Sequence, residues 1–186
     1  MSIRHALGRV TGIAVAATGL AALGMTGVAS ASTGQAAVAA ATNGPLTCTI
    51  QTYNGLYLTA ISGGGRTTDV IETNRTQVGS WEKFTLVDSG DGAANIHYGI
   101  RTSNGHFLTA VSGGGRITDV IHSDATNLLG WEKFTFNSLG YGWYDIQTTD
   151  GHYVTAVGAG GRTADTIHTD ATRVGTWEEF YVSCTH

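Results

Sequence analysis

One stretch of 31 residues occurs three times in this chain, and the repetition constrains the fold more than any other feature. The copies cover residues 54–84, 104–134 and 150–180, and the second reads NGHFLTAVSGGGRITDVIHSDATNLLGWEKF. A repeat of this length cannot bury an apolar face on its own. The three copies must therefore share one hydrophobic core.

Each copy has the pattern of short β-strands. In the first copy an alternating run ends at Asn54-Gly55, a pair that favours a tight hairpin turn because both residues accept positive φ. No segment shows sustained helical periodicity. Four strands are predicted in this copy, over residues 49–52, 57–61, 68–71 and 81–86.

Twelve short strands in three equivalent sets indicate a closed all-β domain. A propeller uses blades of four strands but typically has at least four blades. We therefore predict a β-trefoil with pseudo-three-fold symmetry, a six-stranded barrel capped by three hairpins. The predicted domain covers residues 47–186, with repeats at about 47–96, 97–143 and 144–186.

The N-terminal segment has the features of an export signal. Arg4 and Arg9 precede a short apolar run, and Ala29-Ser30-Ala31 forms a cleavage site, so residues 1–31 are predicted to be a signal peptide. A membrane anchor is the alternative, but no basic flank follows the run. Residues 32–46 are small and uncharged, which indicates a flexible leader, and the mature protein is expected to be secreted.

The two cysteines bracket the repeats. Cys48 precedes the first copy and Cys184 follows the last, and a secreted chain meets an oxidising environment. A Cys48–Cys184 disulfide is predicted, which would place the two ends of the domain side by side. Two cysteines this far apart, without a third, do not indicate a metal site.

The charge balance excludes some partners. Without Arg4 and Arg9, 8 basic side chains remain against 14 acidic ones. Binding to nucleic acid requires a basic face, so no nucleic-acid partner is expected. No basic amphipathic segment indicates membrane insertion.

The motifs resemble those of a known family. NG-x-Y-L-T-A, a Gly-rich turn, N-R-T and G-x-W-E-x-F are similar to the fascin-like β-trefoil modules, which occur in animal actin-bundling proteins and in bacterial secreted proteins, often attached to glycoside hydrolases. The resemblance covers about residues 47–184. It implies a β-trefoil and favours a glycan ligand for a secreted bacterial module. The Q-x-W signature of ricin-type lectins is absent.

Two recurring features favour structural roles. The tryptophans at 81, 131 and 177 could be sugar-stacking platforms, but each is followed three residues later by phenylalanine, and we interpret these tryptophans as core, together with Tyr57, Phe107 and Tyr153. The Gly-Gly-Gly-Arg run of the first two copies could suggest a phosphate loop. It lies between strands and lacks the Lys-Ser or Lys-Thr that opens a helix, so a tight turn is the better interpretation.

The polar residues after that turn are the candidate ligands. Carboxylates, amides and imidazoles at equivalent loop positions could bind sugar hydroxyls, or the aspartates could pair with Arg66, Arg116 and Arg162 to hold each hairpin. Each repeat offers too few ligands for a metal. The candidates are Asp69, Asp119 and Asp165, then Glu72, His122 and His168, then Asn74, Asp124 and Asp170.

Trp143 is a further candidate because it does not recur. In the linker that follows the first copy its counterpart is His97, so Trp143 could be an exposed stacking platform or could pack against the barrel. Small-molecule sites combine an apolar face with a few placed polar groups.

The function predicted from these features is non-catalytic binding of a polysaccharide or cell-surface glycan at up to three weak sites. The acidic residues come in symmetric triplets and no catalytic constellation or cofactor motif is recognised, so neither enzyme activity nor a cofactor is expected. The alternative is a protein-interaction adaptor in a secreted assembly, or an extracellular protease inhibitor. Three matched polar pockets would favour glycans, and one exposed apolar patch would favour the adaptor.

Overall fold

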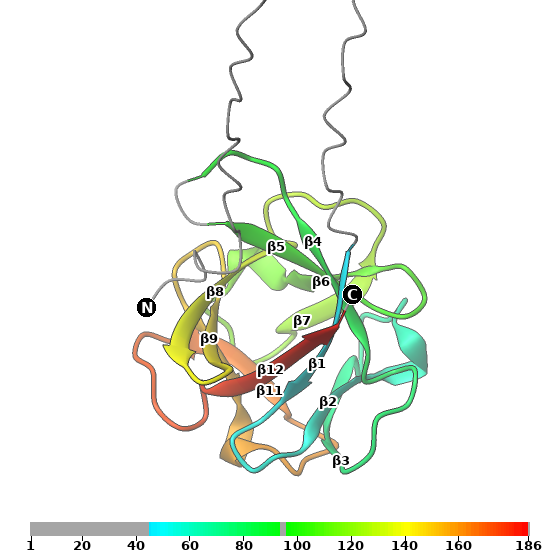
Figure 1. The fold of residues 1–186 in the computed structure, drawn as a ribbon, viewed down its shortest axis with the longest axis vertical. Helices are drawn as coiled ribbons and strands as arrows, with labels where there is room; N and C mark the ends of the chain where they lie inside the picture. The colour runs from blue at the N-terminus through cyan, green and yellow to red at the C-terminus, as the bar shows by residue number, and fades with distance from the viewer. Residues whose placement is uncertain (1–44, 94–95, 186) are drawn as a thin grey trace, which may run out of the picture. The chain divides into compact units, whose positions relative to one another are not determined.

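The computed structural model describes residues 45–93 and 96–185, which form an all-β domain (Figure 1). The predicted signal peptide and nearly all of the leader lie outside the described residues. Twelve strands are present: β1 Leu46–Gln51, β2 Tyr57–Ala60, β3 Ile71–Arg75, β4 Phe84–Asp88, β5 His97–Arg101, β6 Phe107–Ala110, β7 Ile121–Ala125, β8 Lys133–Gly140, β9 Trp143–Gln147, β10 Tyr153–Ala156, β11 Ile167–Ala171 and β12 Phe180–Thr185.

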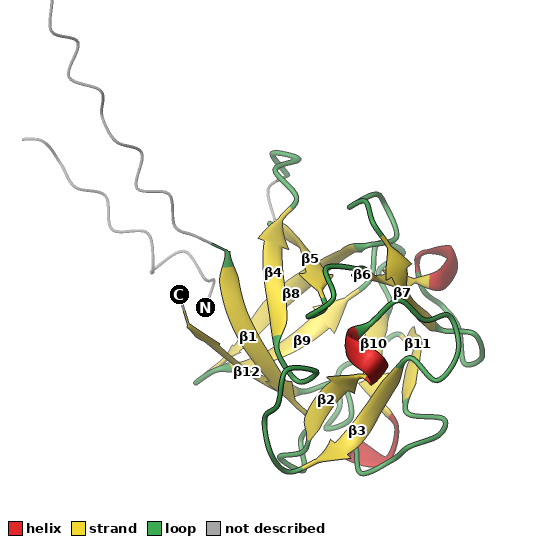
Figure 2. Cartoon of the chain, turned by 90° about the vertical axis from the view of Figure 1, so that its right-hand side faces the viewer, coloured by secondary structure: helices red, strands yellow, loops and turns green. Residues whose placement is uncertain are grey.

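Six of these strands close into a barrel. Antiparallel pairing runs from β1 to β4, β5, β8, β9 and β12, and β12 returns to β1. The other six form the hairpins β2–β3, β6–β7 and β10–β11. Figure 2 shows β1, β4 and β12 on one side of the domain and the three hairpins on the other. The predicted β-trefoil is confirmed.

The core takes equivalent residues from each repeat. Phe84, Phe134 and Phe180, the last residues of the three W-E-x-F motifs, are fully buried. The buried side chains of the first barrel strands and of the hairpins join them; these are Ile50, Ile100, Ile146, Leu58, Leu108 and Val154. The three repeats therefore share one core, and no repeat could bury its apolar face alone.

The interpretation of the repeated tryptophans as core residues is wrong. Trp81, Trp131 and Trp177 are 40%, 51% and 47% exposed. The fourth strand of the first copy begins at Phe84, three residues later than predicted, so Trp81 lies in the turn before it. Of the second aromatic set, only Phe107 is buried, while Tyr57 and Tyr153 are half-buried.

The Gly-rich turns join neighbouring repeats. Gly65 donates its backbone N–H to the Ser123 carbonyl at 2.7 Å, and Ser123 donates to the Arg66 carbonyl at 2.8 Å. The same pair of bonds links Arg116 to Thr169 and Arg162 to Thr73, so each turn contacts the next repeat and the third contacts the first. These N–H groups are occupied by protein carbonyls and do not form a phosphate cradle.

The first and last barrel strands lie side by side. β1 pairs with β12 over five residue pairs, from Thr47↔Thr185 to Gln51↔Tyr181. Cys48 and Cys184 face each other in this register and form the predicted disulfide. β1 begins at Leu46, one residue before the predicted start of the domain. In the described part of the chain, no helix is long and apolar enough to cross a membrane.

Candidate functional site

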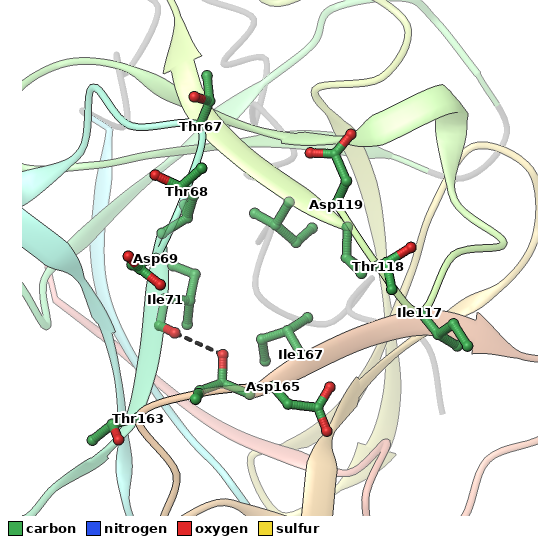
Figure 3. A pocket seen from close by; sticks show the side chains of 15 residues that line it. Thr67, Thr68, Asp69, Ile71, Ile117, Thr118, Asp119, Thr163, Asp165 and Ile167 are labelled. Atoms are coloured by element: carbon green, nitrogen blue, oxygen red, sulfur yellow. Dashed lines mark hydrogen bonds between the residues drawn. The ribbon is translucent and has the colours of Figure 1, made fainter.

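The three hairpins surround a cavity of about 450 Å³. Each repeat contributes the five residues that lead into the second strand of its hairpin, and Figure 3 shows these side chains facing one another across the cavity. Isoleucine and valine line the interior, with threonine and aspartate beside them. One asymmetric bond crosses between repeats, from the Thr166 hydroxyl to the Ile71 carbonyl at 2.6 Å. The lining segments are residues 67–71, 117–121 and 163–167.

The predicted candidates Asp69, Asp119 and Asp165 all lie at this cavity. Their backbones have φ of 46°, 50° and 50°, a left-handed conformation that aspartate tolerates better than most residues. Each carboxylate lies near the arginine three residues before it, at 3.9, 3.6 and 3.3 Å. Each arginine Nε also donates to a carbonyl of the same loop. These contacts hold the turn, and the carboxylates remain more than half exposed.

The position three residues after the aspartate differs between repeats. His122 and His168 bond through Nε2 to Asp119 and Asp165, each at 2.7 Å. The bond from His122 lowers the pKa of Asp119, and the charge of Arg116 adds to the effect. In the first repeat Glu72 pairs with Arg75 at 3.5 Å instead, so it leaves Asp69 without this partner. The three sites are therefore not identical.

The third predicted set does not reach the cavity. Asn74, Asp124 and Asp170 lie further along β3, β7 and β11, outside the lining segments. Asp124 and Asp170 are exposed, and Asn74 is half-buried, with an Oδ1 atom that accepts no hydrogen bond from the described residues. Within residues 45–93 and 96–185, no group of three or more His, Cys, Asp or Glu side chains is arranged to hold a metal ion.

The exposed tryptophans form a second set of equivalent positions. The Trp81 carbonyl accepts the Ala60 N–H at 2.9 Å, and Trp131 and Trp177 make the same bond with Ala110 and Ala156 at 2.8 Å. The loops that carry these tryptophans are therefore fixed in the same way in all three repeats.

The glutamate after each tryptophan is buried and holds the loop. Glu82 accepts one bond from the Thr59 hydroxyl at 2.8 Å and one from the Gly79 N–H at 2.6 Å. Glu132 and Glu178 make the equivalent pairs of bonds. The W-E-x-F motif therefore buries its glutamate and phenylalanine and exposes its tryptophan.

Trp143 lies away from the cavity, on β9, between two tyrosines. Its ring centroid is 5.7 Å from that of Tyr53 and 5.6 Å from that of Tyr181. Sequence reasoning missed both tyrosines. The available signal was their lack of repetition, because Tyr53 aligns with Ser103 and Thr149 and is the only aromatic residue of that set.

The chain matches no protein-family model and no curated protein. Similarity is found among solved structures. The designed three-fold symmetric protein ThreeFoil has a TM-score of 0.60 at 14% identity, covering 73% of this chain and 96% of that one. The Rhizoctonia solani agglutinin has a TM-score of 0.59 at 13% identity, covering 73% and 92%.

An enzyme also contains a similar part. The exo-β-1,3-galactanase from Clostridium thermocellum has a TM-score of 0.62 at 16% identity, and the match covers 77% of this chain but only 30% of the enzyme. Identities this low establish the fold and nothing further.

Proposed function

We propose that this protein is a secreted, non-catalytic carbohydrate-binding protein of the fascin-like β-trefoil type, with up to three equivalent sites. The Cys48–Cys184 disulfide supports an extracellular location, because disulfides persist in oxidising compartments. The agglutinin and the galactanase among the similar structures support a glycan as the ligand class.

The observation that carries this proposal is the exposed tryptophan of each repeat. A large apolar ring at 40–51% exposure gains little from the fold, yet the same ring recurs in all three copies. An aromatic face can stack on the apolar face of a sugar ring. The bonds that fix each loop hold the ring before the ligand arrives, which lowers the ordering cost of binding.

The test begins with a glycan array and pull-down on chitin, cellulose, β-1,3-glucan and peptidoglycan. Trp81→Ala, Trp131→Ala and Trp177→Ala are then measured singly and together against the ligand found. Each single variant should weaken its own site about fivefold, because about 1 kcal/mol of apolar contact is lost. On the immobilised polymer, the triple variant should bind on the order of 100-fold more weakly, because avidity is lost.

Leu129→Gly is the matched control. Leu129 is 66% exposed, and the other two repeats carry Gly79 and Gly175 at this position, so the substitution removes exposed apolar surface while the loop keeps its backbone bond to the buried glutamate. It should bind as the wild type does. Wild-type binding by the triple variant, with an unchanged circular dichroism spectrum, would refute the tryptophan sites.

The cavity residue Asp119 and its hydrogen-bond partner His122 are tested in the same series. Asp119→Ala and His122→Ala remove the carboxylate and the imidazole of one pair. If the cavity contributes to glycan binding, both variants should bind more weakly while Asp124→Ala, outside the cavity, should not.

The adaptor function remains the second candidate, and one observation favours it. Trp143 and its two tyrosines form one apolar patch, which is what the adaptor alternative predicts, but the patch covers less area than a stable protein interface needs. Failure to bind any glycan would shift the proposal to a protein partner.

A further inference from the structure

The cluster of Tyr53, Trp143 and Tyr181, here called the seam triad, occurs at one of three equivalent junctions. Trp143 is paired with Tyr181 across β9 and β12. The same register pairs Thr47 with Thr85 in the first repeat and His97 with Thr135 in the second. A turn residue from the neighbouring repeat lies at each junction. It is Tyr53 at the junction with Trp143, Ser103 at the junction with Thr47, and Thr149 at the junction with His97.

The fold does not require these aromatic rings. At all three junctions, a backbone N–H of the turn donates to a carbonyl of the preceding repeat. At the junction with the aromatic rings, the Asn54 N–H donates to the Ala159 carbonyl. The other two bonds join Asn104 to Gly63 and Asp150 to Gly113. Two junctions therefore close in the same way with serine, threonine and histidine, and the aromatic side chains need another reason.

Exposure indicates that the triad faces a ligand. Tyr53 is 48% exposed and Tyr181 is 37% exposed, whereas rings that only sealed the junction would be buried. The Tyr181 ring lies over Gly142. A Cβ at residue 142 would come within 2.7 Å of this ring, so glycine is needed there to leave room for the ring. Two residues along the same face of β9, Asp145 accepts a bond from the Asn137 amide at 2.7 Å.

The size of the surface favours a small ligand over a protein. Three partly exposed rings offer roughly 200 Å² of apolar area. A stable protein partner needs about 800 Å² on each side. The three rings carry no formal charge and the chain carries a net charge of −4, so a neutral ligand is favoured over a uronic or sulfated one.

The orientation of the rings restricts the ligand further. The Trp143 plane is tilted by 45° from Tyr53 and by 65° from Tyr181. Rings inclined in this way cannot all lie against one flat polysaccharide surface. They can contact successive sugars of a chain that turns between one residue and the next.

We propose that the seam triad is a separate binding site for a single neutral glycan chain with a twisted backbone. It is distinct from the tryptophan positions of the three repeats. Trp143 contacts the central sugar, and Tyr53 and Tyr181 contact its neighbours.

The test uses the four tryptophans of the chain. In the full-length Trp81→Ala, Trp131→Ala, Trp177→Ala variant, Trp143 is the only tryptophan, so its emission reports the seam triad alone. Laminarin, a soluble β-1,3-glucan with a helical backbone, should produce a saturable emission change. Microcrystalline cellulose, which presents a flat surface, should not deplete this variant from solution.

Matched substitutions come from the chain itself. Tyr53→Ser and Tyr181→Thr introduce the residues of the first junction, Ser103 and Thr85, and should weaken laminarin binding at least about tenfold together. Tyr53→Phe keeps the ring and should bind as its parent does. If the multiple variants fail to fold, Tyr53→Ser in the otherwise wild-type chain is titrated with laminarin by calorimetry, and it should bind more weakly than the wild type.

Three results would overturn the proposal. These are no emission change with laminarin, a change that Tyr53→Ser leaves intact, and a change that follows protein concentration without glycan, which would indicate a second copy or a protein partner. The tryptophan sites of the repeats are judged separately, by comparing the wild type with the triple tryptophan variant on the polymer, so either proposal can fail alone.

Discussion

The junction between the third and first repeats differs from the other two in how it is closed. Between repeats one and two the chain runs directly from β4 into β5, and between repeats two and three it runs from β8 into β9. No such connection joins β12 to β1, and the Cys48–Cys184 disulfide takes its place. The seam triad also occurs only at this junction.

This difference separates what the fold needs from what it does not. All three junctions share two kinds of contact. One is the pair of backbone bonds made by the Gly-rich turn, and the other is the bond from the turn after the first strand of a repeat to the preceding repeat. These shared contacts are sufficient at two junctions. Features found only at the third either replace the missing chain connection, as the disulfide does, or serve another purpose.

The largest effect should come from removing the covalent link at this junction. The cysteines are 136 residues apart, so Cys48→Ala with Cys184→Ala should lower the free energy of unfolding by about 5 kcal/mol in the chain-entropy model. Urea unfolding with and without reductant measures the loss.

Reductant is the internal control for the disulfide. It should destabilise the wild type by a similar amount and leave the double variant unchanged. A loss below about 1 kcal/mol would show that the pairing of β1 with β12 closes this junction without the disulfide.

The sequence predicted the features that repeat and missed those whose role depends on direction. The trefoil and the disulfide follow from pattern alone. The tryptophan error arose because the backbone turns at Ser80–Lys83, where Lys83 donates to the Ser80 carbonyl, and strand alternation begins only at Phe84. The alternation of buried and exposed side chains holds only within a strand, and no residue pattern in the sequence indicated that a turn lies here.

The candidate site was predicted in part. The aspartates were identified, but the cavity was not, because segments far apart in sequence meet there only after the barrel closes. Asn74, Asp124 and Asp170 were grouped with them by spacing, yet the strand carries them past the cavity. Tyr53 and Tyr181 were missed because a comparison of repeats draws attention to what recurs.

Substitutions at the shared contacts should destabilise the fold less than loss of the disulfide does, and by the same amount at each of the three junctions. Gly64, Gly114 and Gly160 have φ of 104°, 124° and 100°, and a Cβ on each would lie 2.3–2.4 Å from the hydroxyl of a threonine in the next repeat. Alanine at any of these positions should cost about 3 kcal/mol, through backbone strain and overpacking. Thermal and urea unfolding of the three variants test whether the junctions are equivalent.

Gly55→Ala separates the two causes of that loss. Gly55 has φ of 77° but nothing lies within 4 Å of its Cβ position, so only the backbone strain, about 1 kcal/mol, should appear. Costs that differ by more than about 1 kcal/mol among the three junction glycines would contradict the equivalence of the shared contacts.

The smallest effect concerns Asp145, a buried carboxyl on β9 that accepts its bond across the β8–β9 junction of the second and third repeats. Burial raises its pKa, and the bond from the Asn137 amide opposes the rise only in part. The folded state therefore favours the protonated form. Its contribution to stability is fully present below the pKa of the unfolded chain and is lost as the pH rises through the raised pKa of the folded state.

Asp145→Asn removes this ionisation and keeps an oxygen for the Asn137 amide. It should be more stable than the wild type at pH 7, by about 1 kcal/mol or roughly 3 °C in Tm, and the difference should vanish below about pH 4. Asp119→Asn is the control with the opposite sign, because His122 and Arg116 lower the pKa of Asp119 and favour its charged form. A destabilised Asp145→Asn at pH 7 would mean that the surroundings of Asp145 stabilise its charge, and that this residue helps to close the junction of β8 with β9.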